Sequence, residues 1–138
     1  MEIPWTATSQ PCSSPDATVM ASRFELTTAW RSPAFLARSL RVWRQARHFP
    51  GALGVSLRAQ PLKGTFWTLS AWTDHNALSG FARAEPHRTL MRTSQPWMKN
   101  SVFRFWTTPA GQLNPAQLWA DAQTRIAASD RQPAQPDA

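Results

Sequence analysis

The chain has 138 residues, a hydrophobic fraction of 42% and a formal net charge of +7. This length favours one domain with a single core, and no apolar run approaches the ~18 residues that a membrane span requires. The only cysteine, Cys12, excludes an internal disulfide and a zinc cage built from thiolates. The first residues lack the basic and apolar segments of a signal peptide, so we expect a cytoplasmic protein.

The positive charge is concentrated in the middle of the chain. Residues 18–108 contain 13 Lys or Arg residues against three acidic residues. Such an excess attracts anions, which include nucleic acids, anionic lipids and cofactors that carry carboxylates. The chain also has eight tryptophans and no tyrosine, and the large flat surface of tryptophan suits either a core or a planar ligand.

Pro, Ser and Asp are frequent at both ends of the chain. This composition predicts an extended polar lead over residues 1–17 and a disordered tail over residues 129–138. The sequence between them, residues 18–128, is predicted to form a single domain.

The first two elements of this domain are a strand and a long helix. In residues 18–26, three large apolar side chains fall on one face of an extended segment. Residues 32–49 repeat apolar side chains at the spacing of one helix face. Ser32 is the expected N-cap, with a proline at the first helical position.

A hairpin is predicted next. Residues 53–60 alternate strictly, residues 61–64 (PLKG) form a turn, and residues 65–72 form the second strand. The second strand carries large residues on both faces, which is typical of a strand at the centre of a sheet.

Two short helices, a strand and a final helix complete the chain. Residues 74–84 are predicted to be helical, and Pro86 interrupts this helix and starts another over residues 86–94. Residues 101–108 form the fourth strand. Residues 115–129, which begin close to an Asn-Pro pair, form a C-terminal helix.

The predicted order is β-α-β-β-α-β followed by a helix. This is the ferredoxin-like plan of the α+β class, an antiparallel sheet with helices on one face. The opposite face would be bare although its strands are rich in Phe, Trp, Val and Leu, and such a surface is unfavourable in water. Two sheets packed face to face would cover it, so we predict a homodimer.

The sequence GTFWTLSAWTDHNALSGFARAEPHRTLM, followed by FRFWTT, resembles the dimeric α+β-barrel proteins related to antibiotic-biosynthesis monooxygenases. The shared pattern is a strand that ends in tryptophan, an acidic helix cap, Ala-Leu and Phe on the helix, and a histidine after it. An uncharacterised bacterial family of this superfamily is similar over nearly the whole core, and spheroidene monooxygenase, a haem-dependent oxygenase, is similar more distantly. The resemblance implies a dimeric α+β barrel. It leaves the chemistry open, because the superfamily includes cofactor-free oxygenases, haem enzymes and isomerases.

His87 is the first candidate for chemistry. Haem-binding members of the superfamily use a helix histidine as iron ligand, and the resemblance implies this role for His87; without haem, a neutral imidazole can act as a general base. With haem bound, Trp67 and Trp72 would wall the pocket, and Arg58 or Arg104 would hold a propionate. The alternative is that His87 only hydrogen-bonds the backbone at the start of a short helix.

Five further apolar side chains are candidates for a substrate pocket between the sheet and the helices. They are Phe81, Leu90, Met91, Phe103 and Phe105. Their other expected place is the core or the dimer interface, where most large aromatic residues lie. We therefore predict a monooxygenase-like protein that binds an apolar or planar ligand near His87, with haem as one candidate cofactor. The alternative is a non-catalytic ligand-binding or scaffold dimer.

Nucleic-acid binding is a lesser alternative. The RNA-recognition motif has the same order of elements, and residues 63–70 (KGTFWTLS) begin like its central-strand signature. That signature places aromatic residues at its third, fifth and eighth positions, which here are Thr65, Trp67 and Ser70. Base stacking would rest on one tryptophan, which argues against an RNA partner. The sequence also lacks a Gly-rich phosphate loop and a Gly-x-Ser-x-Gly elbow.

Overall fold

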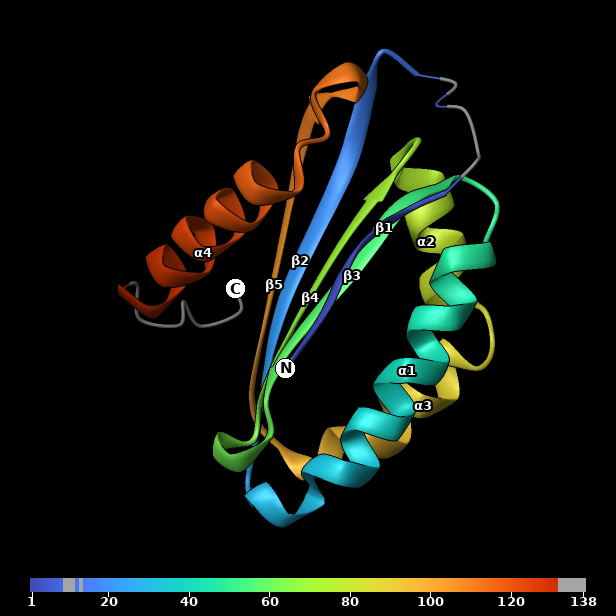
Figure 1. Cartoon of the computed structure of the whole chain (residues 1–138). Helices are drawn as coiled ribbons and strands as arrows, with labels where there is room; N and C mark the ends of the chain where they lie inside the picture. Colours follow the sequence, from blue (N-terminus) through green and yellow to red (C-terminus); the bar gives the residue numbers. More distant parts are fainter. Residues whose placement is uncertain (9–11, 13, 132–138) are drawn as a thin grey trace, which may run out of the picture.

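The fold is a five-stranded antiparallel sheet with helices on both faces (Figure 1). The computed structural model describes residues 1–8, 12 and 14–131. The strands, which lie in the order β1-β3-β4-β2-β5, are β1 Glu2–Ala7, β2 Asp16–Leu26, β3 Ala52–Gln60, β4 Thr65–Trp72 and β5 Met98–Pro109. The helices are α1 Ser32–His48, α2 His75–Arg83, α3 His87–Ser94 and α4 Pro115–Arg131.

The predicted α+β order is confirmed. Every strand and helix expected from residue 18 onward is present, with ends that differ by a few residues. β4 lies at the centre of the sheet, between β3 and β2, as its two apolar faces indicated. Among the described residues, none of the helices combines the length and hydropathy needed to cross a membrane.

The strand β1 lies at one edge of the sheet and is not indicated by the sequence. Residues 2–7, part of the predicted lead, pair antiparallel with β3. Trp5 packs so closely on Gly54 that a β-carbon at residue 54 would overlap the indole ring. Ile3 and Trp5, which alternate along the segment, make too short an apolar pattern to predict a strand. Gly54, which receives the Trp5 ring, is distant in the sequence.

Replacing Gly54 by alanine should loosen β1. The added methyl group has to displace the Trp5 ring, and overpacking of this kind costs about 1–3 kcal/mol in free energy of unfolding. Hydrogen exchange at the Ala59 amide, which donates to the Met1 carbonyl, should become faster. Gly111→Ala is the matched control, because nothing lies within 4 Å of a β-carbon at residue 111. Equal effects of the two substitutions would contradict the close packing of Trp5.

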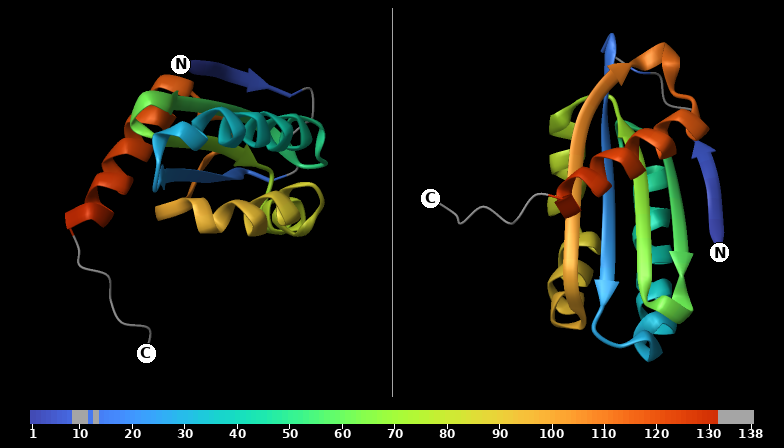
Figure 2. Two further views of the ribbon diagram at one scale, coloured as in Figure 1. Left: turned by 90° about the horizontal axis from the view of Figure 1, so that it is seen from below. Right: turned by 90° about the vertical axis from the view of Figure 1, so that its left-hand side faces the viewer.

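The helices α1, α2 and α3 form one layer on one face of the sheet (Figure 2). In this layer Phe35 of α1 packs on Phe66 of β4, with ring centroids 4.7 Å apart. Ser32 is not the N-cap that we predicted, because a 3-10 turn over Ala29–Arg31 precedes α1. Its hydroxyl instead donates to the carbonyl oxygen of Pro61 at 2.6 Å, which ties the start of α1 to the β3–β4 turn.

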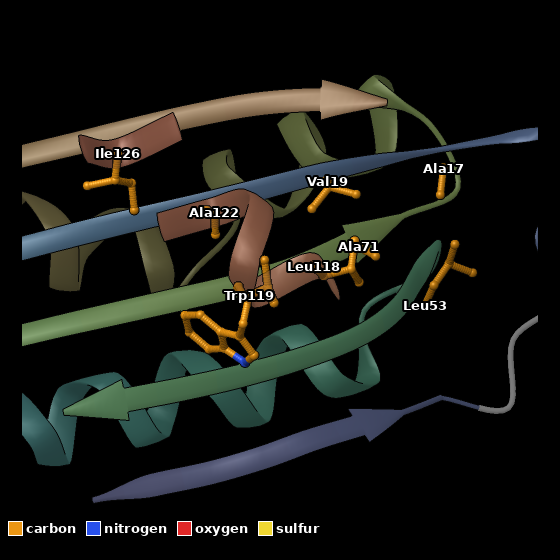
Figure 3. Close-up of a cluster of buried hydrophobic side chains, with 10 residues drawn as sticks. Ala17, Val19, Leu53, Ala71, Leu118, Trp119, Ala122 and Ile126 are labelled. Atoms are coloured by element: carbon orange, nitrogen blue, oxygen red, sulfur yellow. The ribbon is translucent and has the colours of Figure 1, made fainter. Parts of the chain in front are cut away.

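The helix α4 covers the opposite face of the sheet, which we expected to be bare (Figure 3). The buried residues in this layer are Ala17, Val19, Ala21, Leu53, Leu69 and Ala71 from the strands and Leu118, Trp119, Ala122 and Ile126 from α4. The C-terminal helix was predicted, but not the face on which it packs. Because α4 already shields this face, the reason that we gave for a homodimer does not hold.

An ion pair ties the end of α4 to the sheet. Both terminal nitrogens of Arg23, on β2, donate to the carboxylate of Asp130 at 2.7 Å. These hydrogen bonds lower the pKa of Asp130 and raise the pKa of Arg23. The helix α4 extends to Arg131 and so enters the segment that we predicted as a tail. Residues 132–138 lie outside the described residues.

Asp130→Asn should make the stability of the protein less dependent on acid pH. The lowered pKa of Asp130 means that its ion pair stabilises the folded state above roughly pH 4, the unfolded-state pKa, and that this contribution is lost as the pH falls through the folded-state pKa. Urea unfolding at roughly pH 7 and pH 3 should therefore differ less in Asp130→Asn than in the native protein. Asp121→Asn, on the same helix, is the control, and an unchanged pH dependence in Asp130→Asn would contradict the ion pair.

Candidate functional site

A cavity of about 90 Å³ lies between the sheet and the helix layer of α1, α2 and α3. Most of its wall is apolar. The large apolar residues in the lining include Met20, Phe24, Phe35, Val42, Trp43, Leu57, Phe81, Leu90, Met91 and Phe103. A wall of hydrocarbon with a few polar groups is the usual composition of a small-molecule site.

The sheet contributes a polar patch of three hydroxyl groups to this cavity. Ser22 and Thr68 are cross-strand neighbours on β2 and β4, and their hydroxyls share a hydrogen bond. The hydroxyl of Ser70 accepts a hydrogen bond from Nε1 of Trp72 at 2.9 Å. Hydroxyl oxygens have two lone pairs and one proton, so the patch offers hydrogen bonds without introducing a charge.

His87 is held in the cavity wall by contacts from α1 and α2. It is the first residue of α3, directly after Pro86, so the predicted break in the helix is confirmed. The backbone amide of His87 donates to Oε1 of Gln45 at 2.9 Å. The imidazole packs against Phe81, with ring centroids 4.8 Å apart. These contacts fix both the start of α3 and the position of the ring.

The imidazole of His87 is half-buried, and its lowered pKa favours the neutral form at pH 7. Burial lowers its pKa, and a hydrogen bond with the backbone carbonyl of Ala82, 3.0 Å from Nδ1, offsets part of this effect. A carbonyl oxygen only accepts, so the tautomer assigned by this contact carries its proton on Nδ1 and a lone pair on Nε2. Within the described part of the chain no hydrogen bond reaches Nε2. This nitrogen is therefore available as a base or an acceptor.

Two buried N–H groups of α1 lack a hydrogen-bond acceptor among the described residues. They are Nε1 of Trp43, a residue of the cavity lining, and Nε2 of Gln45. A buried donor without a partner costs roughly 1–3 kcal/mol.

Arg38 is the one cation in the described lining besides the titratable His87. Its guanidinium donates to the hydroxyls of Ser94 and Thr93, at 2.8 and 2.9 Å. It also lies 4.0 Å from the centre of the Trp97 ring. Arg38 is therefore held at the end of α3 through one of its two terminal nitrogens.

Solved structures match this architecture, whereas no protein-family model and no curated protein matches the sequence. SnoaB from Streptomyces nogalater, a cofactor-independent oxygenase, has a TM-score of 0.57 at 18% identity, over 72% of this chain and 98% of that one. A proposed antibiotic-biosynthesis monooxygenase from Nitrosomonas europaea has a TM-score of 0.58 at 11% identity, over 76% and 99% of the two chains.

A proposed monooxygenase from Fusobacterium nucleatum has a TM-score of 0.64 at 6% identity. It matches 77% of this chain, which spans only 50% of the Fusobacterium protein. This chain has the antibiotic-biosynthesis monooxygenase-like fold. The resemblance read from the sequence is confirmed for the fold, and at such low identity the chemistry has to be argued from the site itself.

Within this monooxygenase-like fold, five of the predicted site residues line the same cavity. They are Phe81, His87, Leu90, Met91 and Phe103. Phe105 does not belong to the lining, since its side chain is 53% exposed and its ring lies 6.4 Å from that of His75. Trp72 is fully buried against Phe81, with ring centroids 4.9 Å apart, so it supports the wall of the cavity.

The other three predicted residues, Trp67, Arg58 and Arg104, lie on the opposite face of the sheet. Arg58 pairs with Trp67 across β3 and β4, and Arg104 pairs with Ala21, which is buried under α4. Side chains along a strand alternate between the two faces. The structure therefore does not bring these residues to the ligand that His87 would hold.

The residues of the cavity do not fit haem. Its volume of about 90 Å³ is far below the roughly 300–1,000 Å³ that is usual for small-molecule and cofactor sites, and both arginines proposed for the propionates are on the other face. Titration of the purified protein with haemin should give no Soret shift that depends on His87. A stoichiometric shift that is lost in His87→Ala would contradict this expectation.

Sequence reasoning missed Trp43 and the hydroxyl patch of Ser22, Thr68 and Ser70. Trp43 belongs to the helix predicted over residues 32–49, but only the packing reveals that its N–H is buried without an acceptor. The three hydroxyl residues lie on the same face of the sheet as large apolar residues such as Phe24. This alternation was visible in the sequence and could have indicated a polar patch in an apolar wall. The sequence does not say on which face the cavity forms.

Proposed function

We propose that this protein binds a small, planar, mostly apolar molecule with one oxygen atom beside His87, and that it oxidises this molecule as a cofactor-independent monooxygenase. The observation that carries the proposal is the free lone pair of a neutral, half-buried histidine in the wall of an apolar cavity. Such an imidazole can remove a proton at neutral pH.

The dimensions of the cavity limit the ligand. A dry cavity of about 150 Å³ is known to accept benzene, and the cavity here has about 90 Å³. A single ring is therefore the upper limit unless α3 moves outward. The lone pair on Nε2 of His87 favours a ligand that carries a hydroxyl group, which would donate a hydrogen bond to it. Together these features favour a phenol or a similar enol.

The proposed reaction uses O2 as the oxidant and the ligand as the reductant. Nε2 of His87 accepts the proton of the ligand hydroxyl, and the resulting anion transfers electrons to O2. One oxygen atom forms a new bond to a ring carbon, and the other leaves as water with two hydrogen atoms of the ligand, so that a phenol becomes a quinone. The description of SnoaB as a cofactor-independent oxygenase supports this use of the fold.

Isotope labelling tests this function. The protein is incubated under ¹⁸O2 with a panel of single-ring phenols headed by 2-methylphenol, and the products are weighed by mass spectrometry. We expect one ¹⁸O atom per quinone and a reaction that needs His87. If the phenols bind and no labelled product forms with any of them, the oxidation is refuted and only the binding function is left.

A non-catalytic ligand-binding protein is the alternative. His87 is the one described lining residue that can act as a base near neutral pH, and Arg38 is already bound to Ser94 and Thr93. The lack of a second acid or base among these residues favours binding without turnover. A nucleic-acid partner is disfavoured, because helices cover both sheet faces and strand aromatics cannot stack on bases there.

A homodimer is also proposed, now on the basis of β5. Phe103 and Phe105 on this strand are 41% and 53% exposed, and its outer edge pairs with no other strand of the described chain. An unpaired edge with exposed aromatic residues favours association with a second copy. Sedimentation at micromolar concentration should give twice the 15.5 kDa chain mass, and Phe105→Glu should shift the protein toward the monomer. A 15.5 kDa species for the unmodified protein would refute the dimer.

A further inference from the structure

A second cavity lies on the opposite face of the sheet, between the β1–β3 edge and α4. Its volume is about 380 Å³, and its lining includes Arg58, Trp67, Trp119 and Gln123. This volume lies within the roughly 300–1,000 Å³ that is usual for small-molecule sites. No residue belongs to both this lining and that of the His87 cavity.

Two arginines flank Trp67 on this face, and they differ in their partners. Arg23 on β2 and Arg58 on β3 both pair with Trp67 of β4. The terminal nitrogens of Arg23 hold the carboxylate of Asp130 at 2.7 Å. The terminal nitrogens of Arg58 make no hydrogen bond to any described residue, and its Nε, 3.5 Å from an oxygen of Glu2, is buried without one. Arg58 therefore lacks the bidentate anion that Arg23 has.

The guanidinium of Arg58 is already ordered for such an anion. It lies 4.2 Å from the centre of the Trp119 ring. The indole of Trp119 is itself fixed, since it is only 4% exposed and donates from Nε1 to the hydroxyl of Ser56 at 3.3 Å. A guanidinium that is stacked on a ring keeps its in-plane N–H groups free for a carboxylate.

We propose that this cavity binds a planar aromatic carboxylate, with its carboxylate on the terminal nitrogens of Arg58 and its ring against Trp67. The acid nearest to Arg58 is Glu2, whose side chain is 49% exposed. An exposed pair of this kind contributes little to stability, so a ligand carboxylate can replace Glu2. The inference does not depend on the function proposed for the His87 cavity.

Calorimetric titration with 2-naphthoate tests the inference. We expect one site per chain with a dissociation constant below about 1 mM. Arg58→Gln should weaken binding by about tenfold or more, because the charged bidentate contact is lost. The uncharged analogue 2-naphthalenemethanol should bind the native protein more weakly by a similar factor. Glu2→Gln should strengthen the binding of 2-naphthoate, because a competing carboxylate is removed.

Two variants serve as controls. Arg23→Gln removes the other arginine beside Trp67 and should change the affinity by less than about twofold. Leu90→Trp fills the His87 cavity and should leave the affinity for 2-naphthoate unchanged. The absence of binding up to about 5 mM, equal affinity in Arg58→Gln, or loss of binding in Leu90→Trp would each overturn the proposal. If Arg58→Gln fails to fold, Glu2→Gln and the uncharged analogue still decide the matter.

Discussion

Trp72→Ala should lower the free energy of unfolding by about 3–5 kcal/mol, the range measured for large aromatic residues in cores. The side chain is fully buried, and its ring lies 4.9 Å from that of Phe81 and 6.2 Å from that of Phe49, measured between centroids. Truncation leaves a cavity between these rings and removes the hydrogen bond from Nε1 to Ser70. Urea unfolding followed by circular dichroism measures the loss.

Trp30→Ala is the matched control for Trp72→Ala. Trp30 is 74% exposed, so its truncation should change the free energy of unfolding by no more than about 0.5 kcal/mol. Trp72→Phe separates packing from hydrogen bonding, because it keeps an aromatic ring and loses the indole N–H. The free energy of unfolding lost in Trp72→Phe should lie between the losses in Trp72→Ala and Trp30→Ala. Similar small losses in Trp72→Ala and Trp30→Ala would contradict the central position of Trp72.

His87→Ala should reduce the rate of ¹⁸O incorporation by about 10²–10⁴-fold for the phenol that reacts fastest, because the general base is removed. Affinity for 2-methylphenol should fall by up to about tenfold through the lost hydrogen bond. Affinity for 1,2-dimethylbenzene, which has no hydroxyl, should change much less. His48→Ala is the matched control, since His48 is an exposed residue of α1. Equal effects at the two histidines would exclude His87 as the base.

The protonation of His87 also predicts a pH dependence. Burial lowers its pKa below the ordinary value of 6.5, so the neutral base is present at pH 7 and is lost only in more acidic solution. Binding of 2-methylphenol should weaken there, and a profile that stays flat in acid would exclude Nε2 as the acceptor. As the pH falls below about 6.5, His87 becomes protonated in the unfolded chain before it does in the folded protein. His87 therefore destabilises the folded state in acid, and His87→Gln should remove that contribution.

Periodicity was sufficient to predict most of the sheet and the helices. The alternation in β3 and β4 and the apolar face of α1 reflect contacts that follow directly from strand and helix geometry. The position of α4 was beyond such reasoning. Its apolar stripe, which includes Leu118 and Trp119, was visible in the sequence, but a stripe does not specify which face of a sheet it covers. β1 pairs with β3 and places Trp5 on Gly54, and no local pattern in the sequence reveals this fit.

The site was predictable only in part. Leu90 and Met91 follow His87 on the same short helix, so their place in one wall could be read from the sequence. Trp67 and Trp72 were assigned to one pocket, although an odd spacing of five positions along a strand puts them on opposite faces. Phe103 and Phe105 share a face, but only Phe103 reaches the cavity. How far the cavity extends along β5 depends on tertiary packing, and the sequence of this strand does not specify that packing.

Two of the four methionines of the chain line the cavity beside His87. Met20 and Met91 line this cavity, Met1 lines the cavity of Arg58, and Met98 lines neither. The most direct measurement is therefore NMR of the ¹³C-labelled methionine methyl groups during a titration with 2-methylphenol. We predict saturable shifts of the Met20 and Met91 signals, with Met98 unchanged. The absence of shifts at Met20 and Met91, or shifts confined to Met1 or Met98, would contradict ligand binding beside His87.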